Sequence, residues 1–393
     1  MLSQYDEFPV HQTGHPFSRS AVSNYSFDDG YFFGVFSADR DMFLFMGMRI
    51  NPNNNMIGGY AAMMCGGIQQ TVRFKRPWQG DMDTRIGPYA YRFIKPFEEI
   101  QLLLEENDSD LSFNLSWLAT APAFEEAHHF ATNHHRVMTD QTRYSQAGSA
   151  AGWIRYKGEL LTVQPGDWCA SRDHSWGQYY ERPPLAPQKR WLSPLEQPGA
   201  RRALRLWILF STPLISGFFG LHEDSDGNQL EMNDRFGTPF EGMLGHSSDG
   251  NGISLVSADH YLEFEPGGLL MKTGRVTLTD TQGNDWLLEL EATGKPWWPH
   301  TIGYNLGSWK DGGSMVSYPG SDELQSEWDE FDFSRQPFDH ITYSGQSLKQ
   351  IFGPEFLCFI KVTLPDGQVA SGSAQTELVV TPPYKPYGFH TAL

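Results

Sequence analysis

The sequence has 393 residues and a formal net charge of −18, and its 29 lysines and arginines are not clustered into a basic patch. These features exclude the phosphate attraction on which nucleic-acid binding depends. A chain of this length suits two domains. Aromatic residues at 14%, together with 39 glycines and 25 prolines, favour short strands joined by turns over long helices.

Two features of the chain bear on its compartment. Residues 1–7 contain Asp6 and Glu7 where a secretory signal has a basic start, and no apolar run of about 18 residues occurs. The three cysteines, Cys65, Cys169 and Cys358, are far apart and odd in number, which predicts free thiols in a reducing compartment. We therefore expect a soluble, cytoplasmic protein without membrane insertion.

Alternation of apolar and polar residues is the clearest pattern along the chain. In residues 111–119 one strand face would carry Leu111, Phe113, Leu115, Trp117 and Ala119. The same alternation occurs at residues 100–104, 276–278, 288–292 and 358–364. Turn-rich segments at 106–110, 224–228 and 280–285 lie beside these runs. The pattern predicts hairpins in antiparallel sheets.

A histidine cluster follows the strand predicted at 111–119. Two glutamates, Glu125 and Glu126, come first, and the histidines are His128, His129, His134 and His135. The spacing of Glu125 and His128 could place two metal ligands on one helix face. A carboxylate-bridged di-metal site needs a second Glu-x-x-His pair, which the chain lacks, so a polar loop is the preferred interpretation. We predict no metal and no cofactor.

The densest group of chemically active side chains lies at residues 172–177, Arg-Asp-His-Ser-Trp-Gly, shortly after Trp153 and Trp168. In an extended strand, Arg172, His174 and Trp176 share one face. Asp173 and Ser175 then point to the opposite face, unless a bulge beside Gly177 presents both sets. The alternative interpretation is a buried ion-pair network that only ties strands together.

Two later segments concern domain organisation and aromatic packing. Residues 186–200 are rich in proline, which predicts a connector between an N-terminal domain at 1–185 and a C-terminal domain at 201–393. Trp297 and Trp298, followed by Tyr304, suit either a domain core or the wall of an apolar ligand cavity. An antiparallel barrel of eight strands is about large enough to hold one small ligand.

Residues 173–177 resemble the Asp-His-x-Trp-Gly motif of a lipocalin-like superfamily. That superfamily includes carotenoid 1,2-hydratases, kievitone-hydratase-like and AttH-like proteins, and fungal Diels–Alderases of the same double-barrel architecture. The preceding order, Leu115-Ser116-Trp117, then Gln146-x-Gly148, then Gly152-Trp153, is also similar to that of AttH-related proteins. The resemblance is specific over about residues 111–178 and only architectural elsewhere. It implies an all-β fold of two tandem lipocalin-like (calycin) antiparallel β-barrel or sandwich domains.

The resemblance also implies a cavity in or between the domains and a hydrophobic substrate. Carried over, Asp173 would be the proton donor, and His174 its partner or an independent acid. The substrate-binding candidates are Arg172, Trp176, Trp153, Trp168, Trp117, Trp297, Trp298 and Tyr304. The roles of the last three depend on composition alone.

We expect a cofactor-independent acid–base lyase or isomerase of the hydratase or dehydratase type. Its substrate would be a small hydrophobic molecule, such as a terpenoid, polyene or polyketide. A carboxyl group whose pKa is raised by burial could protonate an alkene, and indole faces could surround a carbocation. Two alternatives stay open: a non-catalytic carrier, and a cyclase like the Diels–Alderases that acts by orienting its substrate. A homodimer also stays open.

Overall fold

The computed structural model describes residues 14–80, 82–133, 135–179, 202–230, 238–246, 252–266, 268–294, 296–297, 302–304, 306–333, 340–341, 347–348 and 355–390. Within these residues the regular structure is β-strand, apart from the short 3₁₀ turns η2 (Ala38–Arg40), η3 (Pro52–Asn54) and η6 (Lys385–Tyr387). The predicted all-β fold is confirmed. No helix in the described part of the chain is long and apolar enough to cross a membrane.

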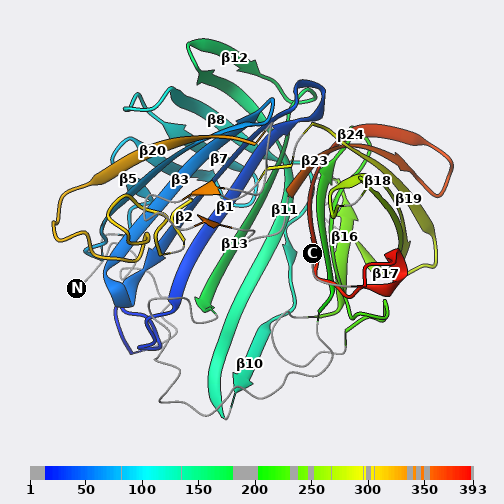
Figure 1. The fold of residues 1–393 in the computed structure, drawn as a ribbon, viewed down its shortest axis with the longest axis horizontal. Helices are drawn as coiled ribbons and strands as arrows, with labels where there is room; N and C mark the ends of the chain where they lie inside the picture. The colour runs from blue at the N-terminus through cyan, green and yellow to red at the C-terminus, as the bar shows by residue number, and fades with distance from the viewer. Residues whose placement is uncertain are drawn as a thin grey trace.

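Fourteen of the described strands form one curled sheet, drawn mostly in blue and cyan in Figure 1. In hydrogen-bonding order its main path is β20-β4-β3-β2-β1-β13-β11-β8-β7-β6-β5, and β9, β10 and β12 pair with the long β11. The bounds are β1 (Phe27–Ser37), β2 (Met42–Asn51), β3 (Met56–Cys65), β4 (Ile68–Pro77), β5 (Arg85–Ile86), β6 (Tyr89–Lys95), β7 (Glu99–Leu104), β8 (Leu111–Ala119), β9 (Phe124–Glu125), β10 (His129–Asn133), β11 (Arg136–Tyr156), β12 (Glu159–Val163), β13 (Cys169–Gln178) and β20 (Gln325–Asp332).

The large sheet has two faces of different character. One face, called the inner face here, carries a single apolar core that includes Phe33, Met46, Phe74 and Trp117. Strand β8 coincides with the predicted strand at 111–119, and its side chains from Leu111 to Trp117 alternate into this core. The opposite, outer face carries a second aromatic cluster that includes Phe43 and Tyr60.

The second unit is a closed barrel of eight strands, at the right of Figure 1. Its strands are β14 (Leu204–Ser211), β15 (Ser216–Glu223), β16 (Phe240–Gly245), β17 (Ile253–Phe264), β18 (Met271–Asp280), β19 (Asp285–Ala292), β23 (Glu355–Thr363) and β24 (Val369–Val380). The strands predicted at 276–278, 288–292 and 358–364 all belong to it. Alternate side chains such as Ile208, Val276 and Ile360 form its apolar core, as expected for a barrel of this strand number. The short strands β21 (His340–Ile341) and β22 (Ser347–Leu348) pair with each other.

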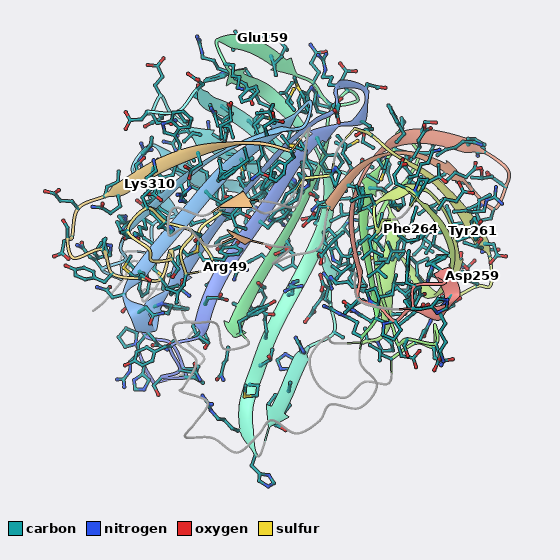
Figure 2. All side chains as sticks on the ribbon, in the orientation of Figure 1. Arg49, Glu159, Asp259, Tyr261, Phe264 and Lys310 are labelled. Carbon is teal, nitrogen blue, oxygen red and sulfur yellow. The ribbon has the colours of Figure 1, made fainter. Side chains whose placement is uncertain are left out.

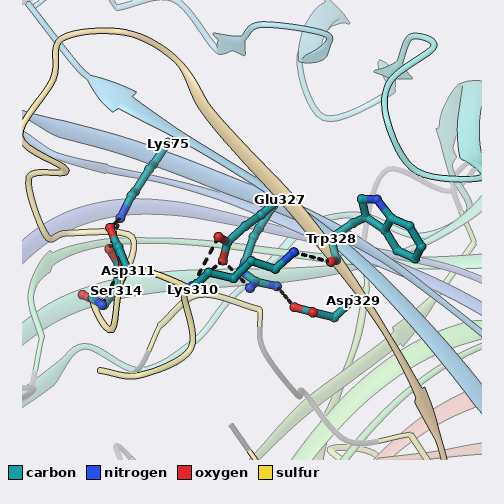
Figure 3. A network of polar contacts seen from close by, with 9 residues as sticks. Lys75, Lys310, Asp311, Ser314, Glu327, Trp328 and Asp329 are labelled. Carbon is teal, nitrogen blue, oxygen red and sulfur yellow. Dashed lines mark hydrogen bonds and ion pairs between the residues drawn. The ribbon is translucent and has the colours of Figure 1, made fainter. Parts of the chain in front are cut away.

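Strand β20 follows the barrel strand β19 in sequence but is paired with β4 of the large sheet. Ion pairs hold it there (Figure 3). The buried Arg73 on β4 contacts Glu327 and places its Nη1 2.6 Å from Asp329 Oδ2. In the segment that precedes β20, Asp311 Oδ2 lies 2.8 Å from Nζ of the buried Lys75 on β4. Residues of the predicted C-terminal half therefore extend the sheet of the first half.

The sheet and the barrel meet through the outer face of β1, β11 and β13. These strands contact β14, β15 and β24 of the barrel. Trp207, Leu209 and Phe218 form a small apolar cluster with Ala147. Ser171 Oγ also donates a hydrogen bond of 2.6 Å to Gln375 Oε1. The connector predicted at 186–200 lies outside the described residues, so the domain boundary stays a prediction.

Candidate functional site

The Arg-Asp-His-Ser-Trp-Gly segment lies on β13, between β1 and β11. Both pairings run along the segment without a shift of register, so no bulge presents its two sets of side chains together. Arg172, His174 and Trp176 point to the inner face, and Asp173 and Ser175 to the outer face. The segment therefore contributes to two separate places, one on each face of the sheet.

His174 is the centre of the inner-face group. Its Nε2 lies 2.7 Å from Asp29 Oδ1 on β1, and its Nδ1 lies 3.3 Å from the hydroxyl oxygen of Tyr144 on β11. The ring of Tyr31 stacks on the imidazole with ring centres 4.1 Å apart. The side chain of His174 is 16% exposed and that of Asp29 is 41% exposed. Solvent or a substrate can therefore reach this group.

Tyr144 also lies beside a buried cation. The Arg172 guanidinium carbon is 5.0 Å from the centre of the Tyr144 ring and 4.8 Å from that of Trp117. Burial raises the pKa of Tyr144, and the charge of Arg172 opposes that rise. Burial lowers the pKa of Arg172, and the neighbouring Tyr144 opposes that decrease. Among the described residues Arg172 has no carboxylate partner, so its charge is available to stabilise a tyrosinate.

Gln146 holds Arg172 in place. Its Oε1 accepts hydrogen bonds from Arg172 Nε and Nη2 at 2.9 and 2.6 Å. Its Nε2 donates bonds of 2.9 Å to the carbonyl oxygens of Phe97 and Ala121. A single buried amide thus fixes the cation and the β6–β7 turn that carries Phe97.

Exposed aromatic rings surround the inner-face group. Trp176 is 38% exposed and its ring centre is 5.1 Å from that of His174. Phe93 and Phe97 are also exposed. The ring centre of Phe93 is 5.5 Å from that of Tyr31, and the ring centre of Phe97 is 5.4 Å from that of Tyr144. Exposed rings around polar groups are typical of a site that takes a mainly apolar ligand.

The geometry supports proton transfer through Tyr144. When His174 donates its Nε2 proton to Asp29, its Nδ1 is free to accept the proton of the Tyr144 hydroxyl. The resulting tyrosinate would lie beside Arg172, and the imidazolium beside the Asp29 carboxylate. Both charges formed by the transfer then have an opposite charge next to them. The group can therefore take a proton from one substrate atom and return it to another.

Asp173 lies on the outer face, in different surroundings. Burial raises the pKa of its carboxyl, and the nearby Arg143 opposes that rise. The partner of His174 is Asp29 and not Asp173, so the two predicted catalytic residues do not form a pair. The catalytic roles predicted for Asp173 and His174 stay predictions.

The structure separates the other predicted site residues. Trp117 and Trp168 are buried in the inner-face core, with Trp117 beneath Arg172. Trp153 is 36% exposed at the far end of β11, where it pairs with Thr162 of β12. Trp297 belongs to the outer-face cluster, against which Tyr304 is packed. Trp298 lies outside the described residues.

Sequence reasoning missed most of the residues that complete the inner-face site. These are Asp29, Tyr31, Phe93, Phe97, Tyr144 and Gln146, from β1, β6, the β6–β7 turn and β11. Gln146 is part of the similar order noted above, although no role follows from that order. Asp29 lies on β1 and Tyr144 on β11. Only the pairing of these two strands with β13 brings them opposite residues of the segment.

The histidine cluster has no metal-binding arrangement in the part of the chain that is described. No group of three or more His, Cys, Asp or Glu side chains there could hold a metal ion. His128 Nε2 contacts Asp140 Oδ1 at 2.8 Å, and its Nδ1 contacts the Thr142 hydroxyl at 3.2 Å. His134 lies outside the described residues. The three cysteines are free thiols.

Fold and site together define an all-β protein in which a curled sheet that carries the Asp29, His174 and Tyr144 contacts is joined to a closed barrel. The chain belongs to a family of unknown function, DUF8625, which it matches over residues 2–341. No curated protein matches it.

Similar solved structures include the crystal structure of CghA with Sch210972. Its identity is 8% and its TM-score 0.47, and the alignment covers 90% of this chain and 88% of that chain. Another is the crystal structure of kievitone hydratase from Nectria haematococca. Its identity is 10% and its TM-score 0.42, and the alignment covers 92% of this chain and 93% of that chain.

Proposed function

We propose that the protein is an acid–base isomerase or lyase of the hydratase type that acts on a small apolar substrate at the inner-face site. The observation that carries this proposal is the chain of contacts from Asp29 through His174 to Tyr144, which ends beside Arg172. Exposed rings around it would hold an apolar substrate over the Tyr144 hydroxyl. No cofactor takes part in this reaction.

In this mechanism Tyr144 exchanges a proton with a substrate carbon or oxygen. His174 stores the proton between the two halves of the reaction, and Asp29 orients the imidazole. Arg172 stabilises the tyrosinate. Acid–base catalysis by a positioned side chain contributes about 10²–10⁴-fold to a rate, which sets the loss expected on removing Tyr144 or His174.

The test is an incubation of the protein with allylic terpenoid alcohols, such as geraniol and linalool. Mass spectrometry then measures the loss of water from each alcohol and the interconversion of the two alcohols. Tyr144→Phe and His174→Gln should lower turnover by about 100-fold or more. Their affinity for the alcohols should stay within a few-fold, because the aromatic rim is intact. The matched control is Tyr261→Phe, at an exposed tyrosine of the barrel, and it should turn over at the wild-type rate.

Other outcomes would contradict the proposal. Loss of turnover in Asp173→Asn, with normal rates in Tyr144→Phe and His174→Gln, would assign the chemistry to the outer face. Binding without product would support the carrier alternative. Product formed at equal rates in all variants would support a cyclase that works by orientation.

A further inference from the structure

The outer face of the large sheet has a polar cradle that the proposed function does not use. Four residues form one row across β2, β1, β13 and β11, namely Arg49, Gly30, Ser175 and Arg143. In the next row Asp28 of β1 and Gln141 of β11 are both paired with Gly177 of β13. We call the side chains of Arg49, Ser175, Arg143, Gln141 and Asp28 the outer-face cradle.

The cradle contains an unusual concentration of unsatisfied polar atoms. Within the part of the chain that the structure describes, the buried atoms without a hydrogen-bond partner include Arg49 Nε, Arg143 Nε, Ser175 Oγ, Gln141 Nε2 and Asp28 Oδ1. Buried polar groups are nearly always paired, so each exception needs a reason. Four of these five atoms belong to groups that can donate a hydrogen bond. The cradle is therefore suited to a ligand that accepts hydrogen bonds.

Arg143 is the cradle residue with the most donor capacity to spare. Among the described residues its one ion pair is with Glu126, at 3.7 Å between Arg143 Nη1 and Glu126 Oε2, and its side chain is 24% exposed. Glu126 Oε1 instead accepts the Ser145 hydroxyl at 2.5 Å. Arg49, by contrast, already pairs with Asp28 Oδ2 at 2.6 Å. A guanidinium matches the two oxygens of a carboxylate.

Glycines make room for the cradle. A Cβ atom at Gly30 would lie 2.7 Å from Arg49 Nη1, so only glycine lets this guanidinium lie flat across β1. In the second row, Gly177 of β13 lies between Asp28 and Gln141 and adds no side chain. Figure 2 labels Arg49 on the large sheet, well apart from Tyr261 and Phe264 of the barrel.

An apolar wall lies beside these donors. Phe32, which is opposite Asp173 on β1, is only partly buried against the aromatic cluster of the outer face. The Tyr304 ring centre is 4.9 Å from the Arg49 guanidinium carbon. Burial raises the pKa of the neighbouring Asp173, and the charge of Arg143 opposes that rise. Donors on one side and rings on the other suit a ligand with one anionic end.

We propose that the outer-face cradle binds a small organic carboxylate with an apolar or aromatic body, with the carboxylate on Arg143 and Ser175 and the body against Phe32 and Tyr304. This site is separate from the inner-face site, because its side chains point away from His174 on the opposite face of the same strands.

The test uses 4-phenylbutyrate as the probe, with 4-phenylbutanol as its neutral counterpart. Isothermal titration calorimetry at low salt should give an affinity at least about 10-fold higher for the carboxylate. Arg143→Gln should weaken 4-phenylbutyrate binding by about 10- to 100-fold. Arg275→Gln, at an exposed arginine on the barrel, should bind like the wild type. The probe should also raise the melting temperature of the wild type but not that of Arg143→Gln.

Ser175→Ala covers the case in which Arg143→Gln fails to fold. It removes a hydroxyl that has no hydrogen-bond partner among the described residues, so the fold should be unaffected, and binding should weaken about 3-fold. Equal affinity for the acid and the alcohol would overturn the proposal. So would binding that survives Arg143→Gln but is lost in His174→Gln, because the anion would then occupy the inner-face site beside Arg172. Since His174→Gln tests the proposed function through turnover, either proposal can fail while the other stands.

Discussion

Strand geometry decides the roles of neighbouring residues in the central segment. Asp173 and His174 are adjacent in sequence, yet their side chains lie on opposite faces of a sheet. His174 finds its carboxylate on β1 and its hydroxyl on β11. The surroundings of each side chain in the segment therefore depend more on the residues opposite it on β1 and β11 than on its neighbours in sequence.

Gly177, the last residue of the segment, gives a prediction at the same scale. Its φ is 124°, and a Cβ atom there would lie 2.2 Å from the carbonyl oxygen of Asp140. Gly177→Ala should therefore lower the free energy of unfolding by about 3 kcal/mol or more, through both strain and backbone collision. Chemical denaturation measures this. The control is Gly66→Ala, with a φ of 57° and open space around the position, which should cost only about 1 kcal/mol. Equal losses would contradict the prediction.

Among the elements, β20 shows how a strand from one half of the chain can complete the sheet of the other. It is an edge strand, and its pairing with β4 covers the backbone groups that β4 would otherwise expose. Arg73 has no exposed surface and is matched by two carboxylates of β20. Removing one partner of a buried pair is costly, because the remaining charge is left uncompensated.

The corresponding prediction concerns Asp329. Asp329→Asn should lower the free energy of unfolding by about 2–4 kcal/mol, because Arg73 then keeps Glu327 as its only carboxylate. Urea denaturation followed by tryptophan fluorescence would measure the change. The matched control on the same strand is Glu330→Gln, which breaks an exposed pair with Lys157 and should cost less than about 1 kcal/mol. A loss as small as the control's would show that β20 is held by its backbone bonds alone.

At the scale of the whole molecule, the junction between sheet and barrel is rich in ionisable groups. Glu241 of β16 accepts a hydrogen bond of 2.8 Å from the Ala127 amide across this junction. Burial, and then the neighbouring Glu126, raise its pKa from 4.5 to about 7. Between these two pH values the folded protein binds this proton more tightly than the unfolded chain does. The stability that depends on the proton is therefore complete below about pH 4.5 and is lost as the pH rises through about 7.

Glu241→Gln should remove this pH dependence. Glutamine keeps an acceptor for the Ala127 amide but cannot ionise. The variant should match the wild type near pH 4.5 and exceed its free energy of unfolding by about 1–3 kcal/mol at pH 8. Denaturation curves at both pH values measure the difference. Glu291→Gln, at an exposed position of β19, serves as the control and should follow the wild type at both. A constant offset at both pH values would mean that the carboxyl acts through shape and not through charge.

Much of the architecture follows from the sequence, because strand alternation and turn residues act locally. The period-two pattern predicted β8 and the barrel strands β18, β19 and β23, and the extended form of residues 172–177 predicted which side chains share a face. Three other features depend on contacts between distant parts of the chain. They are the pairing of β13 with β1 and β11, the pairing of β20 with β4, and the cradle row from Arg49 to Arg143. Neither alternation nor composition encodes which strands become neighbours. For this reason Asp29 and Tyr144, and with them the proposed site around His174, emerge only from the tertiary structure.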